Sequence, residues 1–352
     1  MIRENIQSLV EGASLTGTES RQAMQEIMTG QATNAQIAAF LTALRMKGET
    51  VEELVSFAEV MRQNCHKIHP NVQGRLVDTC GTGGDKLKTF NISTAAAFVI
   101  AGVGISVAKH GNRAVTSKSG SADVLELLGV NLKMEPAAVE RAVEQVGIGF
   151  MYAPAFHPAM KYAVVPRKEV GIRTIFNLLG PLTNPAGASA QVLGVYDAKL
   201  TVPVAKALRS LGCEEALVVH GLDGLDEIST VGKTAISHLK NLEVKTSVVD
   251  PAELGVQKAL VTDLQGASPA ENAKILFNIL SGKIPVGDAR IEIVLVNSAA
   301  GIIVGGKAGD FGEALEIAHE SIRSGAALKK LKKLVKASKG DLSMLEELEK
   351  NA

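Results

Sequence analysis

The sequence predicts an α/β protein with a mostly parallel central sheet, preceded by a helical segment. From residue 75 onward, short apolar stretches typical of strands alternate with helical stretches, an order characteristic of parallel sheets. The first seventy residues show helical periodicity alone. Apolar residues make up 46% of the 352-residue chain, which is ample for a core and excludes general disorder.

Two capping boxes mark the helical segment. Thr33 with Gln36, and Thr50 with Glu53, have the spacing at which a Thr side chain bonds the N3 amide and the Gln or Glu reaches back. Apolar residues follow each box at helical intervals. We expect short amphipathic helices that need a partner surface, either the rest of the chain or a second copy of this segment.

The remaining elements are expected in chain order. They are strands at 75–80 and 105–109, helices at 94–103 and 121–128, a helical stretch at 157–179, a strand at 191–195, a helix at 202–211, strands at 216–220 and 244–249, and helices at 270–280 and 314–324. Lysines alternate with leucines at 329–336, which favours a solvated helix face because acidic residues follow.

Charge and composition exclude several classes of protein. The 37 Lys and Arg residues balance the 37 Asp and Glu residues, so the electrostatic footprint of a DNA-coating protein is missing. Aromatic residues are 3% of the chain and Trp is absent, which leaves little for stacking on single strands. We expect no nucleic-acid partner.

The compartment is predicted from the cysteines and the apolar runs. Three cysteines without paired spacing do not suggest a disulfide framework. The N-terminus lacks the apolar core of a secretory signal, and the longest nearly apolar run, 95–108, is too short to span a bilayer. We expect a cytoplasmic protein without a membrane partner.

A glycine-rich turn at 81–85, with the sequence GTGGD, is the first candidate site. It follows an expected strand and precedes Asn91-Ile92-Ser93-Thr94, which opens the next helix. Glycines let backbone amides approach a ligand, and a helix N-terminus adds free N–H groups and a positive dipole end. The spacing matches neither a Walker loop nor a dinucleotide fingerprint. A plain turn with a helix cap is the alternative, but the combination favours a phosphate or pyrophosphate site.

The second candidate, KHGNR at 109–113, follows the next strand and precedes several hydroxyl residues up to Ser121. Two cations, an amide and hydroxyls at the carboxyl end of a strand suit a multiply charged phosphate ester. A basic surface loop is the alternative, although such a loop has no need for so many small residues.

The third candidate is the acidic turn at 223–227, which contains Asp226 and Glu227. Adjacent hard carboxylates suit Mg²⁺, which proteins hold with one or two carboxylates plus substrate phosphate oxygens. Acidic turns are also common on surfaces. His157 could line a pocket or be structural, and either Arg167 or Arg173 could pair with a substrate carboxylate. The sequence shows no set of residues for covalent catalysis, so no general base or nucleophile is assigned.

Taken together, these motifs resemble the anthranilate phosphoribosyltransferase family of tryptophan biosynthesis. The segment GIRTIFNLLGPLTNP at 171–185 looks like a further signature of that family, and the likeness covers essentially the whole chain. It implies a nucleoside phosphorylase/phosphoribosyltransferase-like fold. A small all-helical domain would comprise 1–73 with a middle segment, 158–188, and a larger α/β domain would comprise 74–157 and 189–352.

The resemblance also implies a homodimer and a Mg²⁺-dependent reaction with two ions per subunit. Phosphoribose would pass from phosphoribosyl pyrophosphate to the amine of anthranilate, with release of pyrophosphate. The matching positions for phosphoribosyl pyrophosphate are Gly81, Gly84, Asp85, Thr89, Asn91, Ile92, Ser93, Thr94, Lys109, His110, Gly111, Asn112, Arg113, Ala114, Val115, Thr116, Ser117 and Ser121. Those for anthranilate are Gly81, Asn112, His157 and Arg167, and those for the metal are Ser93, Asp226 and Glu227.

Two departures and two alternatives accompany this interpretation. Lys86 stands where the family has a small residue, and Phe156 where a more polar residue is frequent. A pyrimidine nucleoside phosphorylase shares a loop like KHGNR, but the GTGGD turn and the Asp226-Glu227 pair speak against it. A nucleic-acid-binding relative of the same fold is the second alternative, and the balanced charge and few aromatic residues speak against that.

Overall fold

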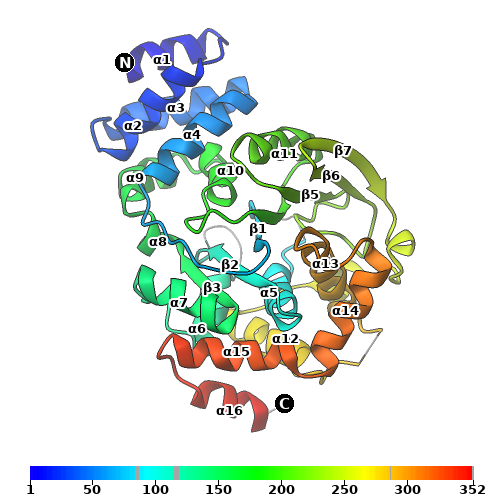
Figure 1. Cartoon of the computed structure of the whole chain (residues 1–352). Helices are drawn as coiled ribbons and strands as arrows, with labels where there is room; N and C mark the ends of the chain where they lie inside the picture. Colours follow the sequence, from blue (N-terminus) through cyan, green and yellow to red (C-terminus); the bar gives the residue numbers. More distant parts are fainter. Residues whose placement is uncertain (85–86, 115–118, 286, 351–352) are drawn as a thin grey trace.

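The computed structural model describes residues 1–84, 87–114, 119–285 and 287–350. Four helices form the N-terminal segment at one end of the molecule (Figure 1). They are α1 (Ile2–Val10), α2 (Gly17–Met28), α3 (Asn34–Lys47) and α4 (Val51–Gln63). Both predicted capping boxes are confirmed: Gln36 N donates to Thr33 Oγ1 at 3.3 Å, and Glu53 N donates to Thr50 Oγ1 at 3.2 Å.

A seven-stranded sheet forms the centre of the rest of the chain. Its strands are β1 (Leu76–Gly81), β2 (Ser106–Gly111), β3 (Ile148–Tyr152), β4 (Ala190–Gly194), β5 (Glu215–Gly221), β6 (Thr234–Lys240) and β7 (Glu243–Val249). The strand order is β3-β2-β1-β4-β5-β6-β7. The first five are parallel, and β6 and β7 extend the sheet as an antiparallel hairpin. The predicted mostly parallel α/β fold is therefore confirmed.

Helices cover the sheet and its ends (Figure 1). They are α5 (Ile92–Gly102), α6 (Ser121–Leu127), α7 (Pro136–Val146), α8 (Ala153–Phe156), α9 (Lys161–Val170), α10 (Ile175–Leu182), α11 (Thr201–Ser210), α12 (Pro269–Leu280), α13 (Ala289–Val304), α14 (Phe311–Arg323), α15 (Ala326–Ala337) and α16 (Ser343–Lys350). None of the helices within the described ranges is both long and apolar enough to cross a bilayer.

The prediction of one continuous helical stretch at 157–179 is wrong. Gly171 has φ +67° at the end of α9, and α10 begins only at Ile175. A left-handed glycine ends a helix without the steric cost that other residues incur. Helix α10 continues through Pro181 to Leu182.

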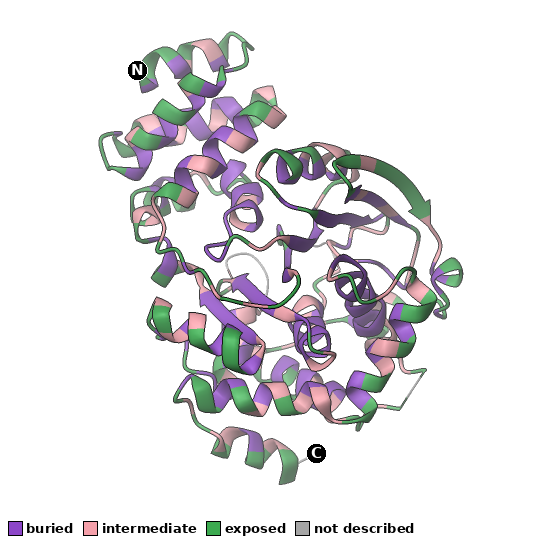
Figure 2. Cartoon of the chain, in the orientation of Figure 1, coloured by how far each residue is buried: buried purple, intermediate pink, exposed green. Residues whose placement is uncertain are grey.

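Two apolar cores lie on the two faces of the sheet. Val192 and Leu217 belong to the core built with α5 and α13. Their neighbours in sequence, Leu193 and Val218, belong to the core built with α10, α11 and the N-terminal helices. This alternation is the period-two pattern of a strand buried on both faces. Figure 2 shows the buried central strands and the exposed outer strand β7.

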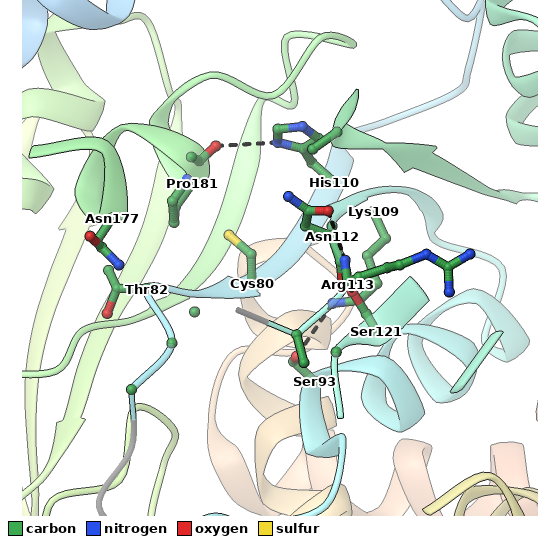
Figure 3. A pocket seen from close by; sticks show the side chains of 18 of the residues that line it. Cys80, Thr82, Ser93, Lys109, His110, Asn112, Arg113, Ser121, Asn177 and Pro181 are labelled. Carbon is green, nitrogen blue, oxygen red and sulfur yellow. Dashed lines mark hydrogen bonds between the residues drawn. The ribbon is translucent and has the colours of Figure 1, made fainter. Parts of the chain in front are cut away.

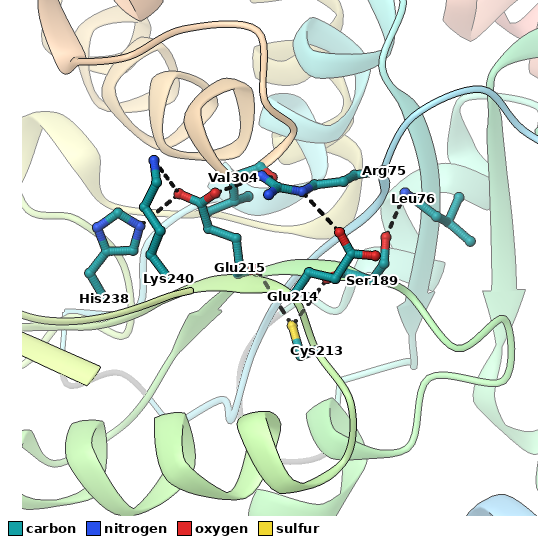
Figure 4. A network of polar contacts seen from close by, with 9 residues as sticks. All are labelled: Arg75, Leu76, Ser189, Cys213, Glu214, Glu215, His238, Lys240 and Val304. Atoms are coloured by element: carbon teal, nitrogen blue, oxygen red, sulfur yellow. Dashed lines mark hydrogen bonds and ion pairs between the residues drawn. The ribbon is translucent and has the colours of Figure 1, made fainter. Parts of the chain in front are cut away.

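A polar network at the amino end of β5 joins β1, β6 and α13 to this strand (Figure 4). Glu215 is 1% exposed, and its carboxylate lies 2.6 Å from Arg75 Nη1, 2.8 Å from His238 Nε2 and 3.2 Å from Lys240 Nζ. Burial alone would raise the pKa of Glu215, but the hydrogen bonds from His238, Arg75 and Lys240 hold the pKa below its ordinary value. The network therefore stabilises the fold with an ionised carboxylate.

We expect Glu215→Ala to lower the free energy of unfolding at pH 7 by about 3 kcal/mol, because it leaves partly buried cations without their counter-charge. Since the native pKa is depressed, this stabilisation is present above the unfolded-state pKa of about 4.3 and is lost as the pH falls through the native value. Urea unfolding at pH 7 and at pH 3.5 measures both effects. Glu214→Ala is the matched control, because Glu214 pairs with the same Arg75 but is 59% exposed. A loss at Glu215 no larger than at Glu214 would contradict the account.

Candidate active site

A cavity of about 560 Å³ opens at the carboxyl ends of β1 and β2, and residues of α9 and α10 also line it. Figure 3 shows its residues from β1, β2 and α10. The cavity brings together every described residue that the family resemblance places in the substrate and metal sites, whereas Arg173, the alternative to Arg167, does not line it. The residues brought together are Gly81, Gly84, Thr89, Asn91, Ile92, Ser93, Thr94, Lys109, His110, Gly111, Asn112, Arg113, Ala114, Ser121, His157, Arg167, Asp226 and Glu227. The predicted residues Asp85, Val115, Thr116 and Ser117 lie outside the described residues, as does Lys86.

The glycine-rich turn continues directly from β1. Gly83 and Gly84 have φ values of +70° and +81°, which residues with a side chain rarely adopt. Thr82 N donates to Gly194 O at 2.9 Å, and this bond anchors the start of the turn to β4. The turn therefore brings backbone amides to the cavity, as the sequence predicted.

The first turn of α5 forms the adjoining wall. Asn91 donates through Nδ2 to Ser119 O at 3.2 Å, so its side chain joins the two predicted phosphate loops instead of capping its own helix. The amide of Ser93 donates to Glu227 Oε1 at 3.2 Å. The N-terminus of this helix therefore already contacts an anionic group, which its dipole favours.

Lys109 supplies a buried cation at the end of β2. It is 4% exposed, and its Nζ donates to Thr79 O and, at 3.3 Å, to Ser93 Oγ. Burial lowers the pKa of Lys109, whereas the nearby acidic groups, Asp78 foremost, act to raise it. A cation in this partly desolvated position interacts strongly with a ligand's negative charge.

Close backbone approach fixes the acidic turn against β1 and β4. A Cβ atom on Gly194 would lie 1.5 Å from Asp226 O, and a Cβ atom on Gly81 would lie 2.6 Å from Asp226 Oδ2. Position 194 therefore requires glycine, because the contact there is with backbone, whereas a side chain at position 81 would displace the carboxylate of Asp226. A hydrogen bond to α13 also holds the turn, because Ile228 N donates to Asn297 Oδ1 at 2.9 Å. Asp223, from the same predicted motif, bonds Ser229 and Leu225 within the turn and does not line the cavity.

Ser93, Asp226 and Glu227 offer hydroxyl and carboxylate oxygens, the hard ligands that Mg²⁺ prefers. Among the described residues, no group of three His, Cys, Asp or Glu side chains is placed to hold a metal ion. Proteins usually hold Mg²⁺ with one or two carboxylates, and water and substrate oxygens supply the remaining ligands.

His110 and His157 form a second cluster, with ring centroids 5.0 Å apart. Burial lowers the pKa of His110 to about 3 and that of His157 to about 4, so both rings are neutral near pH 7. His110 Nδ1 lies 3.2 Å from Gly180 O, while the Nε2 atoms of both rings are buried without a hydrogen-bond partner among the described residues. Both residues line the cavity as neutral imidazoles, and their Nε2 atoms are themselves shielded from it.

Arg167 lies on α9 with its guanidinium 5.2 Å from the ring centroid of Phe176 on α10. Within the described ranges, Arg167 makes no ion pair. Burial lowers its pKa, yet an arginine remains charged at neutral pH. A half-buried cation beside an aromatic ring suits the carboxylate of a flat aromatic ligand.

Arg113 differs in orientation from Lys109 and Arg167. Its guanidinium bonds Glu126 at 2.8 and 2.9 Å and Asp123 at 3.0 Å, and it lies 5.8 Å from the ring centroid of Tyr152. This arginine lines the cavity but is held by carboxylates of α6. An incoming phosphate would have to compete with those carboxylates for it.

The structure adds residues to which the sequence analysis gave no role. Asn177, Gly180, Pro181 and Thr183 line the cavity from α10 and the residues after it. They belong to the family signature at 171–185, and this signature is the sequence feature from which their place in the site could have been predicted. Met61, Cys80, Phe90 and Lys161 also line the cavity.

A buried carboxylate supports the floor of the cavity. Asp78 is fully buried in β1 and accepts hydrogen bonds from His110 N at 3.2 Å and Asn184 Nδ2 at 2.8 Å. Gln191 Nε2 donates to Pro181 O at 2.8 Å beside it. These bonds join β1, β2 and β4 to the segment that follows α10, and so position Pro181 and His110.

Comparison with known proteins gives consistent results. Residues 73–328 match the glycosyl transferase family, a/b domain, and residues 3–65 match the glycosyl transferase family, helical bundle domain. Anthranilate phosphoribosyltransferase of Acetivibrio thermocellus is 51% identical over 97% of this chain and 98% of its own length. The chain belongs to the anthranilate phosphoribosyltransferase family.

Further members of this family are also similar to the chain over nearly its full length. The Methanocorpusculum labreanum protein of the same name is 51% identical over 97% of this chain and 99% of its own length. The crystal structure of the Thermus thermophilus enzyme has a TM-score of 0.90 at 38% identity, with 95% of this chain and 99% of that chain covered. The Saccharomyces cerevisiae enzyme in complex with PRPP and Mg has a TM-score of 0.89 at 30% identity, with 96% and 98% covered.

The predicted family and fold class are thereby confirmed, and the chain is an enzyme of the glycosyltransferase family. The pyrimidine nucleoside phosphorylase and nucleic-acid-binding alternatives are not favoured.

Proposed function

We propose that this enzyme transfers the phosphoribosyl group of phosphoribosyl pyrophosphate to the amine of anthranilate, in tryptophan biosynthesis. One observation carries the proposal: a single cavity holds diphosphate-type donors and a hard carboxylate pair on one side, and on the other neutral imidazoles and an arginine that makes no ion pair with the described residues. A charged phosphate ester and a small aromatic acid fit these two sides.

The diphosphate side consists of the glycine turn, the first turn of α5 and Lys109. Gly83 N and Ser93 N are amide donors there, and Lys109 adds a fixed positive charge. The 109–121 segment would bind the 5′-phosphate. Ser93, Asp226 and Glu227 would hold Mg²⁺, in keeping with the yeast relative in complex with PRPP and Mg; two ions per subunit stay a prediction.

The anthranilate side consists of Arg167, His157, Asn112 and the residues around Pro181. The charged guanidinium of Arg167 would pair with the anthranilate carboxylate, and the buried aromatic ring of Phe176 lies beside it. The yeast enzyme has also been solved in complex with 4-fluoroanthranilate, which supports an aromatic amine as the acceptor.

The chemistry follows from these positions. The anthranilate nitrogen forms a bond to the anomeric carbon of ribose while the bond from that carbon to the pyrophosphate oxygen breaks, and the amine then loses one proton to solvent. An aromatic amine is neutral near pH 7, so a strong general base is not required. Bound Mg²⁺ would supply positive charge to the leaving group. Lys109 and the loop amides stabilise the same charge, and the cavity walls orient the amine.

The finer organisation is also proposed. Residues 1–73 with 158–188 would form the helical domain, and 74–157 with 189–352 the α/β domain. A homodimer would form through the helical domain, and a cytoplasmic location stays a prediction. A strictly monomeric mass by light scattering at assay concentrations would contradict the homodimer.

We expect Arg167→Gln to raise the KM for anthranilate by about 10- to 100-fold, with a much smaller effect on the KM for phosphoribosyl pyrophosphate. The reason is the lost charge-assisted bond to the carboxylate, which is worth about 1.5–3 kcal/mol. Steady-state kinetics with each substrate varied in turn measures the two values. Lys168→Gln is the control, because it removes an exposed cation one residue further along α9. Equal changes in both KM values would contradict this role for Arg167.

The proposed reaction is tested by incubating the enzyme with anthranilate, phosphoribosyl pyrophosphate and MgCl₂ and following anthranilate fluorescence. The expected result is a loss of fluorescence that requires all three components. Unchanged fluorescence with folded enzyme, or an equal loss without phosphoribosyl pyrophosphate, would overturn the proposal.

A further inference from the structure

Two carboxylates already occupy amide donors on the diphosphate side of the cavity. Gly83 N donates to Asp226 Oδ2 at 2.9 Å, and Ser93 N donates to Glu227 Oε1 at 3.2 Å. The first amide belongs to the glycine turn and the second to the first turn of α5. The donor and acceptor residues are 143 and 134 positions apart in the sequence. These contacts therefore form only when the glycine turn, α5 and the acidic turn come together in the folded chain.

We propose that Asp226 and Glu227 are specificity-determining residues that admit a metal-complexed diphosphate and exclude metal-free anions. This inference rests on the proposed function and adds a selective role to the carboxylates. In the absence of a metal ion, their oxygens act as internal competitors for the amides that the diphosphate needs.

Electrostatics gives the competition its direction. A metal-free pyrophosphate would have to displace both carboxylates from their amide donors and then lie beside two negative charges, which repel it strongly at short range. The two carboxylates bind a divalent cation more strongly than they bind a neutral amide N–H group. Binding of the metal complex therefore releases the amides and neutralises the repulsion in a single event.

The surroundings make retreat of the acidic turn difficult. The backbone at Asp226 is pressed against Gly194, where even a Cβ atom would lie 1.5 Å from Asp226 O. Ile228, two residues later, is bonded to Asn297 on α13 at 2.9 Å. Since the backbone of the turn is held on both sides, the exchange must occur through the side chains of Asp226 and Glu227. We therefore expect the selectivity to depend on the side chains of Asp226 and Glu227 and not on movement of the turn.

The test uses pyrophosphate as the probe and isothermal titration calorimetry with the full-length enzyme. Pyrophosphate is titrated in EDTA and, separately, in excess MgCl₂, with blank titrations to subtract magnesium–pyrophosphate formation. The variants are Asp226→Asn with Glu227→Gln, which keeps the side-chain shapes while removing both charges, and the single Glu227→Gln. Glu243→Gln with Glu320→Gln is the matched control, because it removes two charges from side chains that are 70% and 54% exposed.

We expect wild type and the control to bind metal-free pyrophosphate at least about tenfold more weakly than the magnesium complex. The double variant should bind metal-free pyrophosphate at least about tenfold more tightly than wild type does, and the single variant should fall between them. The magnesium preference should disappear in the double variant. Tenfold corresponds to about 1.4 kcal/mol. Melting curves establish that each variant is folded, and the single variant provides the test where the double variant does not fold.

Two results would overturn the inference while leaving the proposed function intact. One is wild-type binding of metal-free pyrophosphate as tight as that of the magnesium complex. The other is magnesium-dependent binding by wild type without any gain of metal-free binding in the folded variants. If folded wild-type enzyme bound pyrophosphate under neither condition, the diphosphate site itself would be refuted, and the proposed function with it.

Discussion

Asp226→Asn combined with Glu227→Gln is expected to lower kcat/KM by at least about 10³-fold while leaving the fold intact. Losing one preorganised electrostatic contact to a developing charge typically costs about 10²–10³ in rate, and this change removes both carboxylate ligands of the proposed metal site. Asn and Gln keep acceptor oxygens toward Gly83 N and Ser93 N, so the turn stays supported, although by neutral hydrogen bonds weaker than those of the carboxylates.

The magnesium dependence of kcat/KM checks the reason for this loss. A single Glu227→Gln change should need a higher MgCl₂ concentration for its maximal rate than wild type does, because only one of the two carboxylate ligands remains. The surface pair Glu243→Gln and Glu320→Gln removes the same charge at a distance and should match wild type. Near-normal activity of the double variant at any MgCl₂ concentration would refute the metal assignment.

Lys109→Met is expected to lower kcat/KM for phosphoribosyl pyrophosphate by at least about 100-fold. The Nζ atom lies 3.3 Å from Ser93 Oγ on the diphosphate side, and at 4% exposure its charge is only weakly screened by water. Removing a fixed charge that stabilises the leaving group costs about 2.7–4 kcal/mol in comparable sites. Steady-state kinetics below the melting temperature of the variant measures this loss.

Stability and catalysis can be separated at this position. The charge of Lys109 counteracts the effect of burial on Asp78, so Lys109→Met alone should also destabilise the fold, by about 3–5 kcal/mol. Adding Asp78→Asn removes the uncompensated charge and should recover most of the stability without restoring turnover. Recovery of activity together with stability would show that Lys109 acts only through the fold.

The α/β architecture could be predicted because most strands are short apolar stretches between punctuating residues. The missed elements lack that signal for identifiable reasons. β3 contains Gly149, where a Cβ atom would lie 2.6 Å from Val143 Cγ2, and a glycine inside a strand weakens the pattern. Helix α13 is buried on nearly all sides, so it has no polar face to reveal its periodicity. β6 includes polar Ser237 and His238.

The parts of the candidate site that could be predicted are short motifs that directly follow a strand. The GTGGD turn, the KHGNR loop and the Asp226-Glu227 pair each follow a strand, and the carboxyl ends of the parallel strands bring them together. Tertiary contacts could not be predicted in this way. The bonds from Gly83 to Asp226 and from Asn184 to Asp78 join residues more than a hundred positions apart, and no local periodicity encodes them.

The stoichiometry of the reaction tests the central claim most directly. Purified enzyme is incubated with anthranilate, phosphoribosyl pyrophosphate and MgCl₂, and anthranilate loss and pyrophosphate release are measured in the same samples. The account predicts that the two amounts are equal throughout, with no pyrophosphate released when anthranilate is omitted. Pyrophosphate release that is independent of anthranilate, or anthranilate loss without pyrophosphate release, would contradict it.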